Sequence, residues 1–277
     1  MVSPIIAVDT HAHIIDPARF PYSPQAAYRP QGQEIGTLER YLAVLDANRI
    51  SHAIAVQPTS GYLYDHRCVL DAVARSNGRL RAVVRVPPAR AREYASVLDA
   101  PGVVGVRLDL IADGVDVLDA PQMPWLLDAM RERGLQLQIQ CERDQLVRAM
   151  PLVAAARVAA VIDHCGRPVP ALGLTQPGFS ALLELGRNGH FVKLSGPFRF
   201  SEQGPPFHDC EPFVQALLDT FTPDRCLWGS DWPFLRLEDR TDYATGLAQL
   251  AQWVPDADAR GRILADSPAR CFRLLPG

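Results

Sequence analysis

Eight short runs rich in Val, Ile and Leu recur along the chain, and they constrain its fold more than any other feature. The runs span residues 5–9, 52–57, 80–85, 103–108, 135–140, 158–163, 191–195 and 226–230. Apolar residues are nearly continuous within each run, so both faces of each strand are expected to be buried, as in a parallel sheet. Intervals between the runs have helical periodicity. A helix is predicted over 38–48, where the apolar residues that share a face are Leu38, Tyr41, Leu42 and Leu45.

The alternation of eight strands with helices predicts a single-domain, distorted (β/α)8 TIM barrel that occupies residues 1–277. This length suits one such barrel, and no shift in composition marks a second domain. An open doubly wound sheet fits less well because no G-x-G-x-x-G sequence follows any run. Between the third and fourth runs, Pro87, Pro88 and Pro101 are expected to shorten the helix.

Charge and cysteine content narrow the class of partner. With 28 basic and 31 acidic residues the net charge is −3, and no block of like charge predicts binding to nucleic acid or a membrane. A small-molecule partner is therefore expected, and homo-oligomer formation remains open. The 6 cysteines contain no C-x-x-C pair, which favours free thiols in a reducing compartment. The apolar segment 4–8 is too short for a signal peptide or a membrane span, so we expect a soluble, cytoplasmic protein.

Two histidines close the first run, in the segment VDTHAH at 8–13. The spacing of His11 and His13 points both imidazoles to the same side of a strand, because side chains alternate between its faces. Taken alone, the pair could equally be a solvated strand end. A third histidine, His164, follows the sixth run in the segment VIDHCG at 161–166, where a histidine hydrogen-bonded within the core is the alternative.

An aspartate follows the last run in the segment CLWGSDWP at 226–233. Taken alone, Asp231 could be a turn or helix-capping residue. In a barrel, however, the C-terminal ends of all strands face one cavity, so Asp231 is expected to meet His11, His13 and His164 there. Three imidazoles and a carboxylate can hold a divalent metal ion, or polarise a carbonyl group while the carboxylate activates water.

Three segments carry a resemblance to a known family: DTHAH at 9–13, DHCGRP at 163–168 and WGSDWP at 228–233. They resemble the motifs of the amidohydrolase superfamily, in particular its lactonase branch, which includes hydrolases of 2-pyrone-4,6-dicarboxylate and of sugar-acid lactones. The similarity extends from about residue 5 to residue 275. It implies a lactone hydrolase that uses no metal or a single ion, in which Asp231 is the base that activates water.

The resemblance also implies substrate-binding residues. Arg107 and Arg199 match arginines that bind substrate carboxylates in the lactonases, and a guanidinium suits that task through its bidentate geometry. A salt bridge inside the barrel is the alternative for Arg107, and a solvated loop charge is the alternative for Arg199. Further matches to substrate-contacting positions are Tyr28, Thr59 and Gln140.

Two departures from the lactonase pattern bear on the substrate. An acid, Asp113, stands where the pyrone enzymes have a second arginine, and the strand with Gln138 and Gln140 lacks their tyrosine. The sequence therefore favours a lactone with one carboxylate, or a sugar lactone, over the pyrone dicarboxylate.

The metal question also depends on one residue type. Binuclear members of the superfamily use a carboxylated lysine, but Lys193 is the only lysine here and none lies between His13 and His164. A binuclear centre is therefore not expected, and no cofactor is expected to be required. A single zinc or manganese ion on His11, His13, His164 and Asp231 remains open. The alternatives are a mononuclear zinc decarboxylase and, less favoured, a non-catalytic carboxylate-binding protein.

Overall fold

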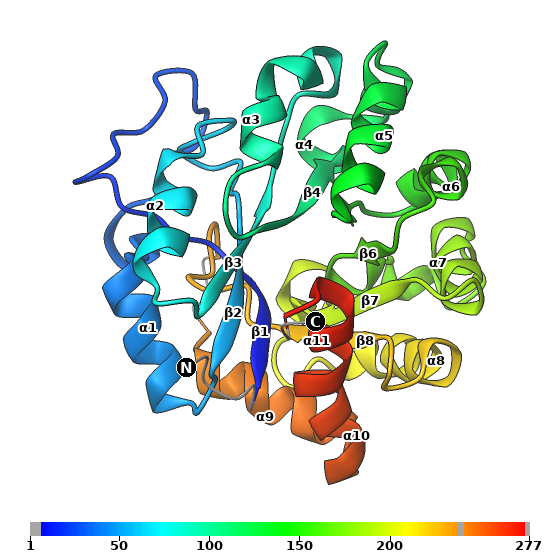
Figure 1. The fold of residues 1–277 in the computed structure, drawn as a ribbon. Coiled ribbons are helices and arrows are strands. Elements are labelled where there is room, and N and C mark those ends of the chain that lie inside the picture. The colour runs from blue at the N-terminus through cyan, green and yellow to red at the C-terminus, as the bar shows by residue number, and fades with distance from the viewer. Residues whose placement is uncertain (1–6, 238–240, 275–277) are drawn as a thin grey trace.

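The computed structural model describes residues 7–237 and 241–274, which form one barrel of eight parallel strands in sequence order (Figure 1). The strands are β1 (Val8–Ala12), β2 (His52–Val56), β3 (Leu80–Val84), β4 (Val103–Asp109), β5 (Gln136–Gln140), β6 (Ala160–Ile162), β7 (Phe191–Ser195) and β8 (Cys226–Gly229). Every neighbouring pair from β1 to β8 is parallel. The predicted TIM barrel is confirmed.

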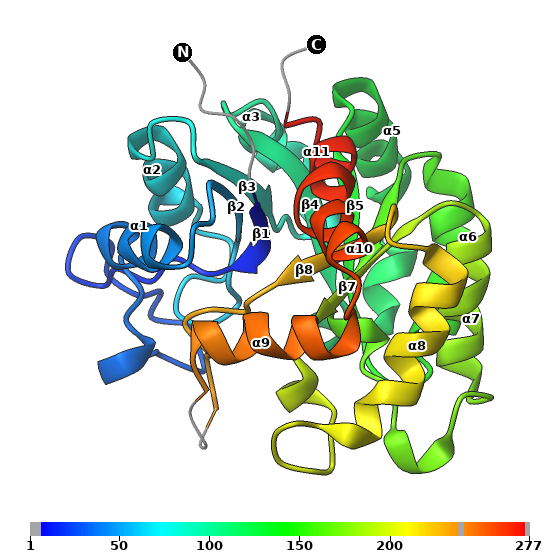
Figure 2. The same cartoon turned by 90° about the horizontal axis from the view of Figure 1, so that it is seen from below.

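Helices surround the strands on the outside (Figures 1 and 2). The longer ones are α1 (Leu38–Ala47), α2 (Arg67–Arg75), α5 (Met123–Arg133), α6 (Gln145–Ala156), α7 (Pro177–Arg187), α8 (Glu211–Phe221) and α9 (Tyr243–Trp253). The shorter ones are α3 (Ala95–Leu98), α4 (Leu110–Asp113), α10 (Ala257–Gly261) and α11 (Ser267–Phe272). The proline-rich interval after β3 forms a 3-10 segment, Pro88–Tyr94, before the one-turn α3, as its prolines predict. No helix within the described ranges is long and apolar enough to cross a membrane.

Strand boundaries differ from the prediction mainly at the first strand. The apolar run suggested 5–9, whereas β1 is Val8–Ala12, and residues 5 and 6 lie outside the described residues. The strand continues through Asp9, Thr10 and His11 because these polar side chains are buried and bonded to other parts of the barrel. Hydrophobicity alone therefore predicts the start of this strand at residue 5, whereas β1 begins at Val8.

The barrel interior is divided into layers along its axis. An apolar layer fills the end from which the strands start, and α11 closes that end. The layer comprises Val8, Ile54, Val56, Val83, Val161, Phe191 and Leu227, with Cys271 and Phe272 from α11. Farther along the strands, the buried interior residues become polar, as at Gln138, Asp163 and Lys193. Because alternate residues of a strand point inward, the change occurs within two residues where Val161 is followed by Asp163 and Phe191 by Lys193.

The barrel closes where the chain after β8 meets β1. The backbone N–H of Asp231 donates to the carbonyl of His11 at 2.8 Å, and that of His13 donates to the carbonyl of Trp232 at 2.8 Å. The Thr10 hydroxyl adds a bond of 2.8 Å to the Trp228 carbonyl. This seam places two segments from opposite ends of the chain side by side.

The Asp9 carboxylate fastens the seam from behind. It accepts hydrogen bonds from the backbone N–H groups of His11 and Ser230, at 3.0 and 2.9 Å, and from the Ser230 hydroxyl at 2.6 Å. The hydroxyls of Tyr41 in α1 and Tyr243 in α9 donate to it at 2.8 and 2.9 Å. Five donors around one buried carboxylate tie two helices and both sides of the seam together.

Replacing Asp9 with asparagine tests this account of barrel closure. The amide NH2 replaces an oxygen that faces donors, so at least two buried donors lose their acceptor, at roughly 1–3 kcal/mol each. We expect Asp9→Asn to lower the free energy of unfolding by about 2 kcal/mol or more, measured by urea denaturation with tryptophan fluorescence. Asp116→Asn, at an exposed site, is the control. Equal stability of both variants would contradict the role given to Asp9.

Candidate active site

The four predicted catalytic residues meet at the mouth of the barrel. His11 lies in β1, His13 follows it, His164 follows β6, and Asp231 follows β8. The Asp231 Oδ1 atom lies 3.4 Å from His13 Nε2 and 3.7 Å from His11 Nε2. Its Oδ2 atom lies 4.0 Å from His164 Nε2. All four side chains are buried, so their convergence agrees with the sequence argument.

Two of these residues occupy an unusual backbone conformation. Asp231 has a φ of 60° and His164 a φ of 50°, in the left-handed region that residues other than glycine seldom adopt. Such conformations are held by the surrounding structure and cluster at functional sites. Here they turn the chain sharply at the end of β8 and β6, which aims both side chains back toward the barrel axis.

The rings of His13 and His164 are each oriented by a contact of the Nδ1 atom, on the side away from Asp231. The His13 Nδ1 atom contacts the Val56 carbonyl at 2.8 Å, and because a carbonyl only accepts, Nδ1 carries the proton. The His164 Nδ1 atom lies 2.9 Å from the Ser195 hydroxyl at the end of β7. Bonds of this kind fix the ring planes so that both Nε2 atoms face Asp231.

Burial and charge set the protonation of the group. Burial lowers the pKa of His164 to about 4 and holds the pKa of His11 well below its usual range, so both rings are neutral at pH 7. Burial alone would raise the pKa of Asp231, but Arg199 and His164 hold it well below its usual range. The site thus combines an ionised carboxylate with neutral imidazoles.

Arg199 is paired directly with this carboxylate. Its Nη2 and Nε atoms lie 2.7 and 2.8 Å from Asp231 Oδ2, and its Nη1 atom donates to the Leu235 carbonyl at 2.7 Å. Arg199 is therefore an element of the site and not a solvated loop charge. It covers one oxygen of Asp231 and leaves the other facing His11 and His13.

A charged layer lies directly beneath the histidines. Lys193 Nζ is 3.1 Å from Asp163 Oδ1, and Arg107 Nε is 3.2 Å from Asp163 Oδ2. Gln138 donates to Asp163 Oδ2 at 2.9 Å and accepts from Lys193 at 2.9 Å. Lys193 also contacts His11 Nδ1 at 3.2 Å. Arg107 thus has the internal salt bridge considered from the sequence and also reaches the cavity above.

A cavity of about 380 Å³ opens above Asp231. Its polar lining comprises His13, Thr59, Ser60, Arg107, Asp109, Gln140, His164, Arg167, Arg199, Asp231 and Arg236. The predicted substrate-binding residues Arg107, Arg199, Thr59 and Gln140 are all among them. The Gln140 Oε1 atom is buried and has no hydrogen-bond partner among the described residues, which leaves it available to a ligand. Thr59 donates instead to Asp109, at 2.8 Å.

Tyr28 does not lie on the wall of this cavity, contrary to the sequence expectation. Its hydroxyl donates to Glu34 at 2.6 Å, and Arg236 lies over its ring at 4.4 Å. The reason is that the loop before α1 packs against the segment after β8, where Glu34 also accepts from the backbone of Arg236. Tyr28 therefore supports a cavity residue and does not line the cavity itself.

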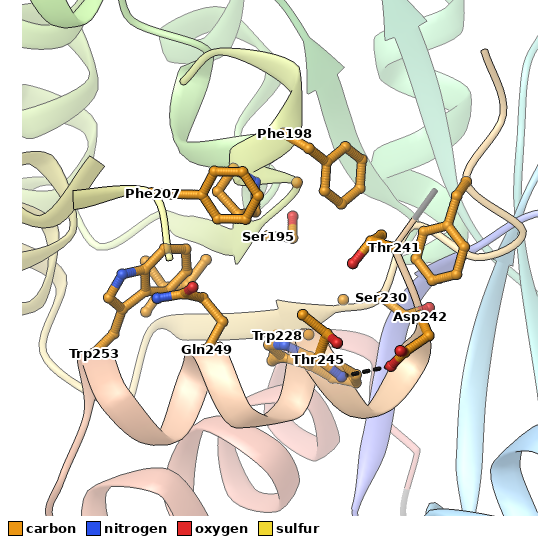
Figure 3. Close-up of a pocket in the computed structure, with 16 residues that line it drawn as sticks. Ser195, Phe198, Phe207, Trp228, Ser230, Thr241, Asp242, Thr245, Gln249 and Trp253 are labelled. Atoms are coloured by element: carbon orange, nitrogen blue, oxygen red, sulfur yellow. Dashed lines mark hydrogen bonds between the residues drawn. The ribbon is translucent and has the colours of Figure 1, made fainter. Parts of the chain in front are cut away.

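A second, smaller cavity lies beside the first, between α9 and the segment that follows β7 (Figure 3). It measures about 20 Å³ and is lined mainly by apolar side chains, including Phe198, Phe207, Trp228 and Trp253. This volume is too small for a lactone ring, so we assign the functional site to the larger cavity. Phe198 lines this smaller cavity and is not among the residues that line the larger one.

The sequence analysis did not identify Arg167 and Arg236 as residues of the site, and it assigned no role in the site to Lys193. Arg167 stands in the DHCGRP segment, where its position three residues after His164 was a usable signal. Lys193 was noted only as evidence against a binuclear centre, although a lone lysine inside an apolar strand is itself informative. Arg236 follows β8 in a loop with no local pattern that would distinguish it.

The donor set fits a single divalent cation in composition. Atoms of His11, His164 and Asp231 lie within 4.8 Å of one another, and two imidazoles with one carboxylate suit zinc. Lys193 lies on β7 beneath the site, where its Nζ atom contacts His11 Nδ1. Among the described residues there is no second group of His, Cys, Asp or Glu side chains that could hold another metal ion. Two cations, Arg199 and Lys193, already contact this donor set.

Comparison with known proteins agrees with this geometry. A 4-sulfomuconolactone hydrolase from Rhizobium radiobacter is 34% identical over 280 residues, which cover 97% of this chain and 90% of that protein. A 2-pyrone-4,6-dicarboxylate hydrolase from Comamonas testosteroni is 28% identical, with 97% and 90% covered. The crystal structure of a probable 2-pyrone-4,6-dicarboxylic acid hydrolase from Acinetobacter baumannii with citric acid bound matches with a TM-score of 0.86 and 26% identity, over 97% of this chain and 100% of that chain.

These relatives confirm the resemblance seen in the sequence and the predicted enzyme class, a lactone hydrolase. The amidohydrolase family model matches residues 8–274, which include every strand of the barrel and all four residues at its mouth. The chain therefore belongs to the amidohydrolase family.

Proposed function

We propose that the protein hydrolyses a lactone that bears at least one acidic substituent, with Asp231 as the general base. The observation that carries this proposal is the charge of the cavity wall around the base. Four arginines line it, Arg107, Arg167, Arg199 and Arg236, against two aspartates. An anionic substrate suits such a wall because guanidinium groups bind carboxylate or sulfonate oxygens with paired N–H donors.

The relatives support the same substrate class. One acts on a sulfonated lactone by its name and another on a pyrone dicarboxylate, while a related structure holds citric acid, a tricarboxylate. The sequence argument against two acidic groups rested on the absence of a second arginine, where Asp113 stands, and of a tyrosine on the strand with Gln138 and Gln140. In the structure Asp113 pairs with Arg85 at 2.8 Å and does not line the cavity, so it does not repel a second carboxylate there.

The proposed reaction uses one water molecule. Asp231 takes a proton from this water as its oxygen attacks the lactone carbonyl carbon, and the ring C–O bond then breaks. The proton passes to the departing oxygen, so the product is the ring-opened hydroxy or oxo acid. Neutral His11 and His164 stand beside the base, where an imidazole N–H stabilises the negative charge that develops on the carbonyl oxygen.

Arg199 links substrate charge to the strength of the base. While it pairs with Asp231, the carboxylate is a weak proton acceptor. An acidic substituent competes for the same guanidinium, and as it draws Arg199 away the basicity of Asp231 rises. An anionic lactone thus activates its own hydrolysis, which a neutral lactone does not do.

A screen of lactones with no, one or two acidic groups, monitored by proton release, tests the proposed function. We expect kcat/KM to be higher for the acidic lactones by about tenfold to a hundredfold per contact, because one charge-assisted bond is worth roughly 1.5–3 kcal/mol. Hydrolysis confined to neutral sugar lactones would overturn the proposal.

The same assay tests the base. Asp231→Asn should fold normally and lose about a thousandfold or more in kcat, as expected for loss of general-base catalysis. Asp109→Asn, which also changes a carboxylate on the cavity wall, is the matched control and should lose far less. Turnover near that of the wild type in the Asp231 variant would remove Asp231 from the mechanism.

The pH dependence should reveal the pairing of Arg199 with the base. Since Asp231 must be ionised to accept a proton, activity is lost as pH falls through its pKa, which Arg199 holds well below the usual range. In Arg199→Gln the acidic limb of the kcat/KM profile should therefore move to higher pH, by about one unit or more. Arg199→Lys keeps the charge and should move it less. An unchanged limb in the glutamine variant would contradict the pairing.

We further propose that the reaction requires no metal. If an ion binds, His11, His164 and Asp231 would hold it, and it would polarise the carbonyl and lower the pKa of bound water. The proposal is supported by Arg199, whose guanidinium group already pairs with one Asp231 oxygen.

We also infer a cytoplasmic location. All six cysteines are free thiols, as is usual in a reducing compartment.

Dialysis against a chelator tests the metal proposal. Most of the activity should remain, because the charges that neutralise the site belong to the protein itself. Measurement of metal content before and after dialysis is the control. Loss of activity that zinc or manganese restores would show that the enzyme is mononuclear.

A further inference from the structure

Lys193 is the only lysine of the chain, and its side chain is completely buried inside the barrel. A buried ammonium group is costly unless it is paired, so its partners indicate what it does. It contacts three groups, Asp163, Gln138 and His11, the last of which belongs to the proposed catalytic set. Lys193 itself does not line the cavity.

The hydrogen-bond directions around Lys193 follow from chemistry. An ammonium group has three donors and no lone pair, so it can only donate. Gln138 uses its NH2 group toward Asp163 Oδ2, which leaves its oxygen to accept from Lys193 at 2.9 Å. At His11 Nδ1, 3.2 Å away, Lys193 must likewise be the donor.

The competing partner of His11 Nδ1 is less well placed. Asp163 Oδ1 is 3.4 Å from this nitrogen, farther than the Lys193 ammonium at 3.2 Å, and the same oxygen is paired with Lys193 Nζ at 3.1 Å. A proton on Nδ1 would therefore face the nearer ammonium group. With Nδ1 as an acceptor, a neutral His11 carries its proton on Nε2, the nitrogen that lies 3.7 Å from Asp231 Oδ1 and has no partner of its own among the described residues.

We propose that Lys193 is a positioning residue that keeps the proton of His11 on Nε2, so that His11 presents an N–H to the reacting lactone carbonyl. This proposal rests on the proposed function only for the identity of the acceptor. The Nε2–H is a hydrogen-bond donor for the oxygen that becomes negative when water attacks. The same tautomer has no lone pair on Nε2, so it cannot bind a metal ion through that atom.

Nitrogen-15 NMR of the histidine rings tests the proposal directly, because long-range ¹⁵N–¹H spectra distinguish a protonated ring nitrogen from a bare one. The chain has 7 histidines, and His11→Gln identifies the signals of His11 by their loss. We expect wild-type His11 to carry its proton on Nε2 at neutral pH. In Lys193→Met, which removes the donor at similar size, the proton should move to Nδ1, toward Asp163.

The kinetic expectation is a fall in kcat for an acidic lactone in Lys193→Met, with little change in KM, because the arginines that bind the substrate are kept. A wild-type His11 protonated on Nδ1 would overturn the proposal, as would a variant that keeps both the Nε2 proton and the wild-type kcat. The wild-type spectrum decides alone if the variant fails to fold. The NMR result does not depend on any lactone being a substrate. Failure of the proposed function can therefore be distinguished from failure of the proposal for Lys193.

Discussion

The carboxylate of Asp163, fully buried inside the barrel, is the charge on which the rest of the site depends. Lys193 from β7 and Arg107 from β4 neutralise it, and Gln138 from β5 bonds to it. Removing Asp163, Lys193 or Arg107 would leave a buried charge without its partner in a medium of low polarity, at a cost of about 3–5 kcal/mol. These ion pairs and hydrogen bonds therefore link four consecutive strands, β4 to β7, and the layer above them is built on a rigid base.

The layered interior explains how one barrel combines stability with chemistry. At one end, the side chains from the strands and α11 form an ordinary apolar core. At the mouth, Asp231 and its histidines are buried and polar, and they would be unstable against a purely apolar floor. The charged layer between the two ends contacts this group from below through Lys193, which bonds to His11, and the arginines of the cavity wall contact it from above through Arg199.

The sequence predicted the barrel, seven of its eight strand positions and the convergence of the four residues at its mouth, because strand hydrophobicity and barrel geometry are local and general rules. It located β1 too early, since nothing in the run itself shows that Asp9 is hydrogen-bonded by residues more than 200 positions away. It matched Tyr28 to a substrate-contacting position, but it could not show the contacts between two loops that keep Tyr28 off the cavity wall. The pairing of Arg199 with Asp231 was likewise beyond reach, because it depends on a distance across the barrel.

The seam between β1 and the segment after β8 has a consequence for the order in which the protein is made. His11 leaves the ribosome with β1, whereas Asp231, whose backbone bonds to that of His11, emerges only after β8. A nascent chain can pair its early strands as they emerge, but Asp231 cannot meet His11 until β8 has joined the barrel. Synthesis that stops before β8 leaves the edge of β1 unpaired and the histidines without Asp231, so barrel closure and assembly of the candidate site coincide.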